Sequence, residues 1–260
     1  MRKQVAILAG GLGTRLRPIT ETCPKPMVPI FGEPFLHWQI VDLREQGYTD
    51  VILLVSYLGE QIRAHFGDGS KWGVRIEYSF ENEPLGTGGA LRQACEHFKE
   101  TLEDDFVVLN GDSFLRAPLD DVAGFFEDGK FDAVVTTFDN GFRSKILATP
   151  VPNNLKVKNQ IVVEYRKAGG IENGFEQVDS GIYVVKKSLF DKDKTASLGT
   201  KFQLEDVLRP LISKRTYGAF PVEDRFYDIG TVERLKDFEE FVGRERAEGR
   251  LHGREPEGVP

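Results

Sequence analysis

A short apolar run near the start of the chain ends in a cluster of glycines, and this junction limits the possible folds more than any other feature. Val5 to Leu8 predicts a buried first strand. The chain continues Ala-Gly-Gly-Leu-Gly-Thr-Arg-Leu-Arg-Pro, which places glycines at positions 10, 11 and 13. Glycine lacks a Cβ, so the backbone can turn sharply there and its N–H groups can approach a bound anion. The junction therefore predicts a phosphate-binding turn after the first strand.

Three cations follow the glycines on a proline-rich arm. Arg15, Arg17 and Lys25 would face several negative charges at once, which suits a nucleoside triphosphate better than a single carboxylate. Prolines at positions 18, 24, 26 and 29 keep a regular helix from starting directly after the turn. We expect a stiff, mostly non-helical arm that can reach over a substrate. The alternative interpretation is a tight turn with solvated arginines.

Two common glycine motifs do not fit this turn. A dinucleotide-binding fingerprint starting at Gly11 requires glycine where Leu16 stands, and no acidic residue follows the second strand at Ser56. A P-loop requires Gly-Lys-Ser/Thr, which Thr14-Arg15-Leu16 does not supply. Both a dinucleotide-dependent oxidoreductase and a P-loop nucleotide hydrolase are therefore disfavoured.

The amino-acid composition limits the size of the fold, the classes of binding partner and the cellular compartment. With 260 residues, of which 40% are hydrophobic, the chain can form one large domain with a substantial core. Its net charge of −7 provides no general attraction for nucleic acid or an anionic membrane, so we expect neither partner. Only two cysteines occur, and no segment approaches the ~20 apolar residues of a membrane span. A soluble, cytoplasmic protein is the expectation.

The first half of the chain predicts a doubly wound α/β fold. A helical pattern begins at Pro34 and stops at Gly47, and Val51 to Val55 then forms a strand that is apolar on both faces. Strand, turn, helix and strand within about fifty residues make a βαβ unit. Further elements are expected as helices at Gly59 to Phe66 and Leu91 to Phe98 and strands at Val74 to Phe80 and Phe106 to Leu109.

The pattern changes after Phe138. Strands are predicted at Ile146 to Thr149, Ile161 to Tyr165 and Val178 to Val185, separated by Pro, Asn and Gly instead of helices. This favours a mixed central sheet with a β-rich insertion. Helical spacing returns at Phe202 to Ser213 and Val232 to Phe241.

We expect one domain over residues 1–244, with a nucleotide-binding half at 1–138, a sugar-phosphate-binding half at 139–230 and a closing helix at 231–244. Residues 245–260 form a polar tail rich in Gly and Pro, in which Leu251 to Pro260 is expected to be frayed.

Two aspartates stand out as candidate metal ligands. Asp112, in Asn110-Gly111-Asp112, follows a buried strand at the edge where open α/β sheets collect ligands. Asp228 lies just before the last predicted helix. One or two carboxylates are enough for Mg²⁺, which fills its other positions with water and phosphate oxygens. The alternatives are a turn aspartate at 112 and a helix cap at 228.

A second glycine-rich turn, Glu-Pro-Leu-Gly-Thr-Gly-Gly-Ala at 83–90, enters a helix. Its backbone amides could contact a base or accept an anion. The four histidines fall in no motif, and no nucleophile with a neighbouring base can be identified.

Taken together, these segments resemble the sugar-1-phosphate nucleotidyltransferases, also called nucleotide-sugar pyrophosphorylases. The resemblance runs from Ala9 to Thr231 and rests first on Gly-Gly-Leu-Gly-Thr-Arg-Leu-Arg-Pro with Pro-Lys-Pro-Met. Glu-Pro-Leu-Gly-Thr-Gly-Gly-Ala, Asn-Gly-Asp, Asp-Ser-Gly-Ile-Tyr and Asp-Ile-Gly-Thr follow in the same order as in the family. The resemblance implies the reaction of a nucleoside triphosphate with a sugar 1-phosphate to give a nucleotide-sugar and pyrophosphate.

The resemblance also implies roles for individual residues. Arg15 and Lys25 would bind the phosphates as the catalytic cations, and Asp112 and Asp228 would share Mg²⁺. The nucleotide would be bound by residues of the two glycine-rich turns and the strand ends, namely Leu8, Ala9, Gly10, Gly11, Gly13, Thr14, Glu81, Pro84, Gly86, Thr87 and Gly111.

For the sugar phosphate, the family places a lysine directly after a glutamate. Here the nearest equivalent is Lys167, which is preceded by Arg166, and the nearest glutamate is Glu164. The resemblance therefore implies that Lys167 and Glu164 bind the sugar phosphate. Asp179 stands where the family often has Asn or a small residue, and is a candidate for binding sugar hydroxyls.

The second glycine-rich turn and the compact length most resemble guanylyltransferases that act on manno-configured heptose or mannose 1-phosphates. A carboxylate at Glu81 or Glu83 could accept hydrogen bonds from guanine N1–H and N2–H₂. Thymidylyl, uridylyl and cytidylyl transfer remain alternatives, as do a non-catalytic scaffold relative and a glycosyltransferase. Members of the family often associate, so a homo-oligomer is possible, although the sequence identifies no interface.

Overall fold

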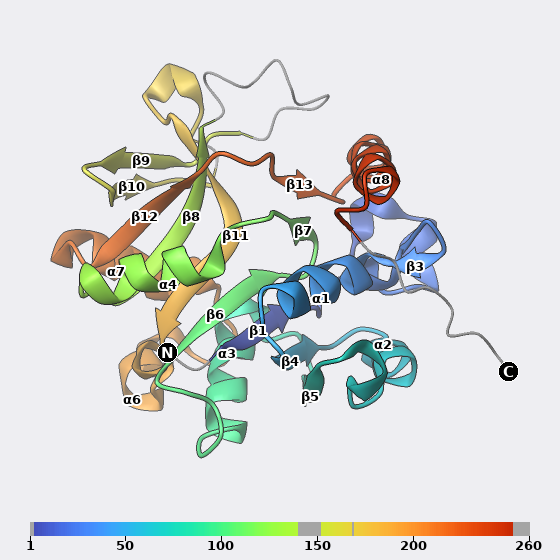
Figure 1. The fold of residues 1–260 in the computed structure, drawn as a ribbon. Helices are drawn as coiled ribbons and strands as arrows, with labels where there is room; N and C mark the ends of the chain where they lie inside the picture. Colours follow the sequence, from blue (N-terminus) through green and yellow to red (C-terminus); the bar gives the residue numbers. More distant parts are fainter. Residues whose placement is uncertain (1–2, 140–151, 168, 252–260) are drawn as a thin grey trace, which may run out of the picture.

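The computed structural model describes residues 3–139, 152–167 and 169–251 (Figure 1). Its strands are β1 (Gln4–Leu8), β2 (Pro29–Ile30), β3 (Glu33–Pro34), β4 (Asp50–Val55), β5 (Arg75–Phe80), β6 (Asp105–Asn110), β7 (Ser113–Phe114), β8 (Ala133–Asp139), β9 (Leu155–Lys158), β10 (Ile161–Tyr165), β11 (Gln177–Lys186), β12 (Tyr217–Val222) and β13 (Tyr227–Asp228). Its α-helices are α1 (Phe35–Glu45), α2 (Gly59–Phe66), α3 (Gly86–His97), α4 (Leu119–Asp128), α6 (Lys192–Thr195), α7 (Leu204–Lys214) and α8 (Val232–Ala247).

A nine-stranded mixed sheet in the order β5-β4-β1-β6-β11-β8-β12-β10-β9 forms the centre of the molecule. Strands β5, β4, β1 and β6 are parallel to one another. Strand β11 runs antiparallel to both β6 and β8, and β10 antiparallel to β12. The predicted α/β class with a mixed central sheet is confirmed.

The parallel half of the sheet creates a switch point. From β1 the chain crosses through α1 to β4 on one side, and later returns to place β6 on the other side of β1. Residues that follow the carboxyl ends of β1 and β6 therefore face a common crevice, where ligands bind in open α/β sheets. The glycine-rich turn and Asn110-Gly111-Asp112 are these residues.

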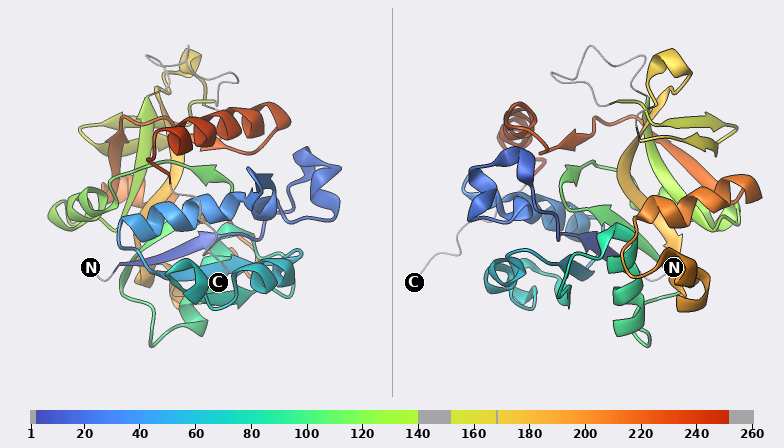
Figure 2. Two further views of the ribbon diagram at one scale, coloured as in Figure 1. Left: turned by 45° about the vertical axis from the view of Figure 1, so that its right-hand side comes forward. Right: turned by 180° about the vertical axis from the view of Figure 1, so that it is seen from behind.

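Helices cover both faces of the sheet (Figures 1 and 2). Apolar residues of α1, α2 and α4 belong to one buried cluster, and those of α3 and α7 belong to a second cluster on the opposite face. Along β1, Val5 and Ile7 lie in the first cluster and Ala6 in the second, as strand alternation requires. This two-sided burial explains why β1, β4 and β6 appear in the sequence as continuous apolar runs.

The structure contains elements that the sequence analysis did not predict. Helix α4 and strands β8 and β12 are the largest of them, and β12 includes Gly218 and Pro221, residues that weaken a strand pattern. The predicted strand at Ile146 to Thr149 lies outside the described residues.

A third apolar cluster joins α1, α8 and two short strands. Strand β13 pairs antiparallel with β7, and α8 packs over this pair through Phe238, which is fully buried. The Phe238 ring centroid lies 4.9 Å from that of Phe35, 5.1 Å from that of Phe114 and 5.8 Å from that of Tyr227. Aromatic contacts thus hold in place the strand that ends in Asp228.

The C-terminal region is more ordered than predicted. Helix α8 continues to Ala247, beyond the expected closing helix of 231–244, and Leu251 is buried at 1% exposure. Glu245, expected at the start of the polar tail, is buried, and its carboxylate accepts hydrogen bonds from Arg116 at 2.8 Å and from Arg250 at 2.6 Å. This ion-pair network anchors residues 245–251, so Leu251 is not frayed as expected, and residues 252–260 lie outside the described residues.

Within residues 3–139, 152–167 and 169–251, no helix has the length and apolar character needed to span a membrane.

We predict that Phe238→Ala lowers the free energy of unfolding by about 3–5 kcal/mol, because the lost ring leaves a cavity among three other aromatic rings. Urea unfolding measures this change. Val232→Ala on the same helix is the control, since Val232 is 44% exposed and its truncation should change stability by no more than about 0.5 kcal/mol. Equal effects of the two substitutions would show that the cluster does not hold α8 in place.

Candidate active site

Two cavities open at the crevice beyond β1 and β6. The larger, with a volume of about 440 Å³, lies beside the first glycine-rich turn, and the smaller, of about 190 Å³, lies between β11, β12 and α7. Thr87, Asn110 and Gln203 line both. The two cavities are therefore neighbours that share a wall.

Most of the residues predicted to bind nucleotide line the larger cavity. They come from the ends of β1, β5 and β6 and from the turn before α3, and they are Leu8, Gly10, Gly11, Glu81, Pro84, Gly86, Thr87 and Gly111. The predicted catalytic cation Lys25 and the predicted metal ligand Asp112 also line this cavity. Ala9, Gly13, Thr14 and Arg15 do not line it, and Ala9 is buried at 1% exposure. Lys201 and Gln203 also line this cavity, although they were not predicted from the sequence.

The arm that carries the cations consists of short 3₁₀ turns, η1 (Thr14–Leu16), η2 (Ile19–Glu21) and η3 (Lys25–Met27). The predicted absence of a regular α-helix here is confirmed. Gly13 has φ of 60°, a left-handed conformation that favours glycine, and its carbonyl accepts a hydrogen bond from Thr20 Oγ1 at 2.7 Å. Gly13 thus folds the arm back on itself and helps to place Lys25.

Lys25 and Asp112 form an ion pair in which the lysine is buried and the aspartate side chain is 42% exposed. Lys25 is 6% exposed, and its Nζ lies 2.6 Å from Asp112 Oδ2. Burial opposes ionisation of Asp112, but the charge and hydrogen bond of Lys25, a hydrogen bond from Ser113 and the charge of Arg15 together hold the pKa of Asp112 below its usual value. The carboxylate is therefore charged at neutral pH and available to a cation.

Asp228 lies next to Asp112 through backbone pairing. The residue opposite Asp228 in the β13–β7 pair is Ser113, and the N–H of Ile229 donates to the carbonyl of Asp112 at 3.0 Å. Both carboxylate oxygens of Asp228 accept from Arg234 Nη1, at 3.0 and 2.9 Å. The structure therefore brings the two predicted metal ligands to one place.

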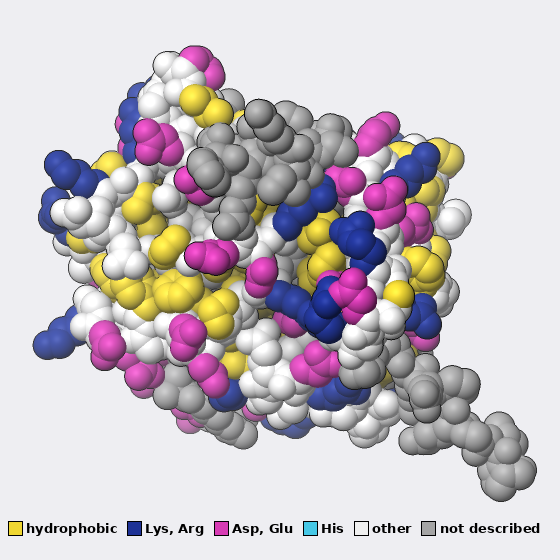
Figure 3. All heavy atoms as spheres, turned by 45° about the horizontal axis from the view of Figure 1, so that its top comes forward, with side chains coloured by type: hydrophobic (Ala, Val, Ile, Leu, Met, Phe, Trp, Pro, Cys, Tyr) yellow, Lys and Arg dark blue, Asp and Glu magenta, His cyan; other side chains and the backbone are white. Residues whose placement is uncertain are grey.

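Arg15 reaches the same region, because a Cβ placed on Gly230 would lie 3.1 Å from Arg15 Nη2. On the face shown in Figure 3, Lys and Arg side chains gather beside a hollow with carboxylates among them. Positive charge is thus concentrated locally on a chain of net charge −7.

Glu81 connects the two glycine-rich turns. Its Oε2 accepts a hydrogen bond from the N–H of Leu85 at 2.8 Å, and a Cβ placed on Gly10 would lie 3.0 Å from its Oε1. Burial raises the pKa of Glu81, while the hydrogen bond from Leu85 opposes that shift. The carboxylate therefore has one oxygen committed to the second turn and the other directed toward the first.

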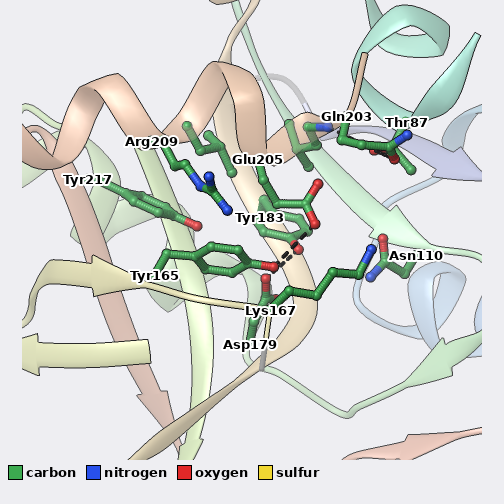
Figure 4. A pocket seen from close by; sticks show the side chains of 12 residues that line it. Thr87, Asn110, Tyr165, Lys167, Asp179, Tyr183, Gln203, Glu205, Arg209 and Tyr217 are labelled. Atoms are coloured by element: carbon green, nitrogen blue, oxygen red, sulfur yellow. Dashed lines mark hydrogen bonds between the residues drawn. The ribbon is translucent and has the colours of Figure 1, made fainter. Parts of the chain in front are cut away.

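The smaller cavity contains three tyrosines and charged residues of both signs (Figure 4). In Figure 4 the Lys167 side chain extends from the tyrosines toward Asn110, which lines both cavities. The position of Lys167 suits a cation that contacts groups in either cavity.

Asp179 lies on the wall of this cavity, as expected for a residue that binds hydroxyls. Its Oδ2 accepts from the Tyr183 hydroxyl at 2.7 Å and its Oδ1 from the N–H of Gly181 at 2.9 Å. Burial raises the pKa of Asp179 to about 6, although both hydrogen bonds lower it.

Glu164, which the family resemblance suggested for the sugar, does not line the cavity. It lies opposite Lys156 in the β10–β9 pair and forms ion pairs with Lys156 at 2.9 Å and Arg166 at 2.7 Å. Because side chains alternate along a strand, the next residue, Tyr165, lies on the other face and lines the cavity. Its hydroxyl donates to Glu205 Oε1 of α7 at 3.2 Å.

The smaller cavity also contains residues that were not predicted from the sequence, namely Tyr165, Tyr183, Glu205, Arg209 and Tyr217. Their spacing in the sequence offers one indication for Glu205 and Arg209. Residues four apart lie on the same face of a helix, so these two side chains can line the same cavity.

We predict that Asp179→Asn stabilises the protein above pH 6. The pKa of Asp179 rises from 3.8 to about 6 on folding, so the folded state binds the proton more tightly than the unfolded state. This group adds no penalty below pH 4, a growing penalty between pH 4 and 6, and a constant penalty of roughly 2–3 kcal/mol above that range. Urea unfolding of both proteins from pH 4 to 8 measures the difference. Asp104→Asn, at a 97% exposed side chain, is the control, and a difference that does not change with pH would contradict the prediction.

Comparison with known proteins agrees with the family resemblance of the sequence motifs. Residues 4–143 match the family model for nucleotidyl transferases. The chain is 35% identical over 233 residues to a D-glycero-alpha-D-manno-heptose 1-phosphate guanylyltransferase of Aneurinibacillus thermoaerophilus, an alignment that covers 87% of this chain and 93% of the relative. It is 34% identical to the protein of the same name from Campylobacter jejuni, with 88% and 96% covered.

Among solved structures, the crystal structure of HddC from Yersinia pseudotuberculosis superposes with a TM-score of 0.72 at 29% identity, covering 92% of this chain and 99% of that one. Sequence motifs, fold and relatives agree, and the chain belongs to the sugar-1-phosphate nucleotidyltransferase family.

Proposed function

We propose that this protein transfers a guanylyl group from GTP to a manno-configured heptose or hexose 1-phosphate, with Mg²⁺ as cofactor, and releases pyrophosphate. The observation that carries the proposal is the shared wall of the two cavities, with Lys25 and Asp112 on one side and Lys167 on the other. The nucleotide occupies the larger cavity and the sugar 1-phosphate the smaller one. Their phosphates then meet at the wall that both cavities share.

Asp112 and Asp228 are suited to holding Mg²⁺. Their backbone segments are hydrogen-bonded to each other, and carboxylate oxygen is a ligand that Mg²⁺ prefers. Among the described residues, no group of three or more His, Cys, Asp and Glu side chains could hold a metal, but Mg²⁺ needs only one or two carboxylates when phosphates and water complete its shell. The ion would supply charge neutralisation at the reacting phosphates.

The reaction needs no general base from the protein. The attacking group is a phosphate oxygen that is already ionised at neutral pH, and pyrophosphate leaves as an anion. The work of the side chains is to hold two polyanions in line and to reduce their repulsion. Lys25, Arg15 and Lys167 are the cations that serve this purpose on the two sides of the junction.

Guanine is favoured by Glu81 and by the relatives. The Glu81 oxygen directed toward Gly10 would accept from guanine N1–H and N2–H₂. Two of the relatives with most of their length matched carry guanylyltransferase names. A UTP–glucose-1-phosphate uridylyltransferase of Synechocystis is 30% identical over 246 residues, so uridylyl transfer is the alternative to test.

The decisive experiment incubates the protein with Mg²⁺, each of GTP, UTP, CTP and dTTP, and a set of sugar 1-phosphates, and measures pyrophosphate. We expect release only for a matched pair, with GTP and a manno-configured sugar 1-phosphate giving the highest rate. Release with another nucleotide would correct the base. No release from any pair would favour a non-catalytic scaffold.

We predict that Lys25→Ala lowers turnover by at least about a hundredfold, because one well-directed charge contact contributes roughly 3–4 kcal/mol to such a transition state. Asp112→Asn and Asp228→Asn should cause losses of similar size. Lys158→Ala, at an exposed position on β9, is the control and should retain full turnover. Near-normal turnover in a folded Asp228→Asn variant would exclude Asp228 as a metal ligand.

We predict that Glu205→Gln raises the KM for the sugar 1-phosphate about tenfold and leaves the KM for the nucleotide unchanged. Glu205 lines the smaller cavity and not the larger one, and a charged hydrogen-bond acceptor contributes roughly 1.5–3 kcal/mol. Steady-state kinetics with each substrate varied in turn separates the two constants. The control is Glu96→Gln, at an exposed position on α3; a rise in both constants would remove Glu205 from the sugar site.

A further inference from the structure

Arg234 is bound to Asp228 in an arrangement that helix stability does not explain. It lies in the first turn of α8, whose N-cap is Thr231. The N-terminus of a helix carries partial positive charge, so a cation there is unfavourable by a few tenths of a kcal/mol or more. The position is explained by Asp228, because Arg234 Nη1 lies 3.0 and 2.9 Å from its two oxygens.

Both proposed metal ligands are thus paired with a cation of the chain. Lys25 lies 2.6 Å from Asp112, and Arg234 pairs with Asp228. Arg15 adds a third positive charge beside Gly230. Three cations surround two carboxylates, so this group of five side chains carries a net positive charge, which opposes the binding of a free divalent cation.

A nucleoside triphosphate reverses this balance, because it carries about four negative charges at neutral pH. A metal ion that arrives with the triphosphate can bind one of the two carboxylates. The lysine or arginine released from that carboxylate can then pair with phosphate oxygens in the same site. Guanidinium groups bind phosphate at least as readily as carboxylate.

We propose that Arg234 is a phosphate-binding residue that is held on Asp228 until the metal–nucleotide complex binds, and that it makes metal binding depend on the nucleotide. This inference rests on the proposed function, in which Asp228 holds the metal. Arg234 excludes free metal before the nucleotide arrives, and it stabilises the phosphates afterwards. The two effects of its removal therefore have opposite signs.

The test measures the Mn²⁺ retained by the protein in equilibrium dialysis, first alone and then with GTP on both sides of the membrane, and without any sugar phosphate. We expect Arg234→Gln to bind Mn²⁺ alone about tenfold more tightly than the wild type, and Mn²⁺–GTP about tenfold more weakly. Arg234→Lys keeps the charge and should bind Mn²⁺ alone as weakly as the wild type does.

Lys236→Gln is the matched control. Lys236 is exposed in the next turn of the same helix, so its substitution removes the same charge without changing the Asp228 pair. We expect both Mn²⁺ affinities of this variant to match the wild type. Circular dichroism melts confirm that each variant is folded at the assay temperature.

The results separate the two proposals. If Arg234→Gln changes both affinities in the same direction, or changes neither, then Arg234 has only a structural role and this inference is wrong. If the wild type and Lys236→Gln fail to retain Mn²⁺ even with GTP, the metal assignment in the proposed function fails, and the inference fails with it.

Discussion

The pairing of β7 with β13 is the interaction on which the proposed chemistry depends. Each strand has only two residues, and together they join the end of β6 to the start of α8. This pairing brings Asp112 and Asp228 together although they are far apart in the sequence. Two-residue strands have little stability of their own. The aromatic cluster around Phe238 supplies it, so the packing energy of these side chains maintains the geometry of the carboxylates.

The same dependence explains why the last turns of the chain are ordered. Helix α8 must remain seated on β13 for Asp228 to keep its place, and the ion pairs of Glu245 with Arg116 and Arg250 fasten its C-terminal end. Arg116 follows β7 closely in the chain and also lies 3.4 Å from Asp42 of α1. Elements from the beginning, middle and end of the chain are therefore joined beneath the site.

The features that could be predicted from the sequence are those that leave a local pattern in it. Strands β1, β4 and β6 are buried on both faces, which produces apolar runs that can be recognised without a structure, and the first glycine-rich turn follows β1 directly. The pairing of β13 with β7 could not be predicted, because two residues give no period. Glu164 shows the same limit at a single side chain. Its role depends on which face of β10 its side chain occupies. In the folded chain the side chain forms ion pairs with Lys156 and Arg166 instead of lining the cavity.

Charge placement connects the fold to the reaction. The chain is acidic overall, and the arm between β1 and β2 concentrates cations where β1 and β6 end. A site formed from cations alone would destabilise itself through repulsion, and carboxylates alone would repel the substrates. Pairing Lys25 with Asp112 and Arg234 with Asp228 avoids both costs, since in the proposed function each charge has a partner that the substrates and their metal would replace. Substrate binding would then exchange one set of ion pairs for another, so little net charge would be buried without a partner.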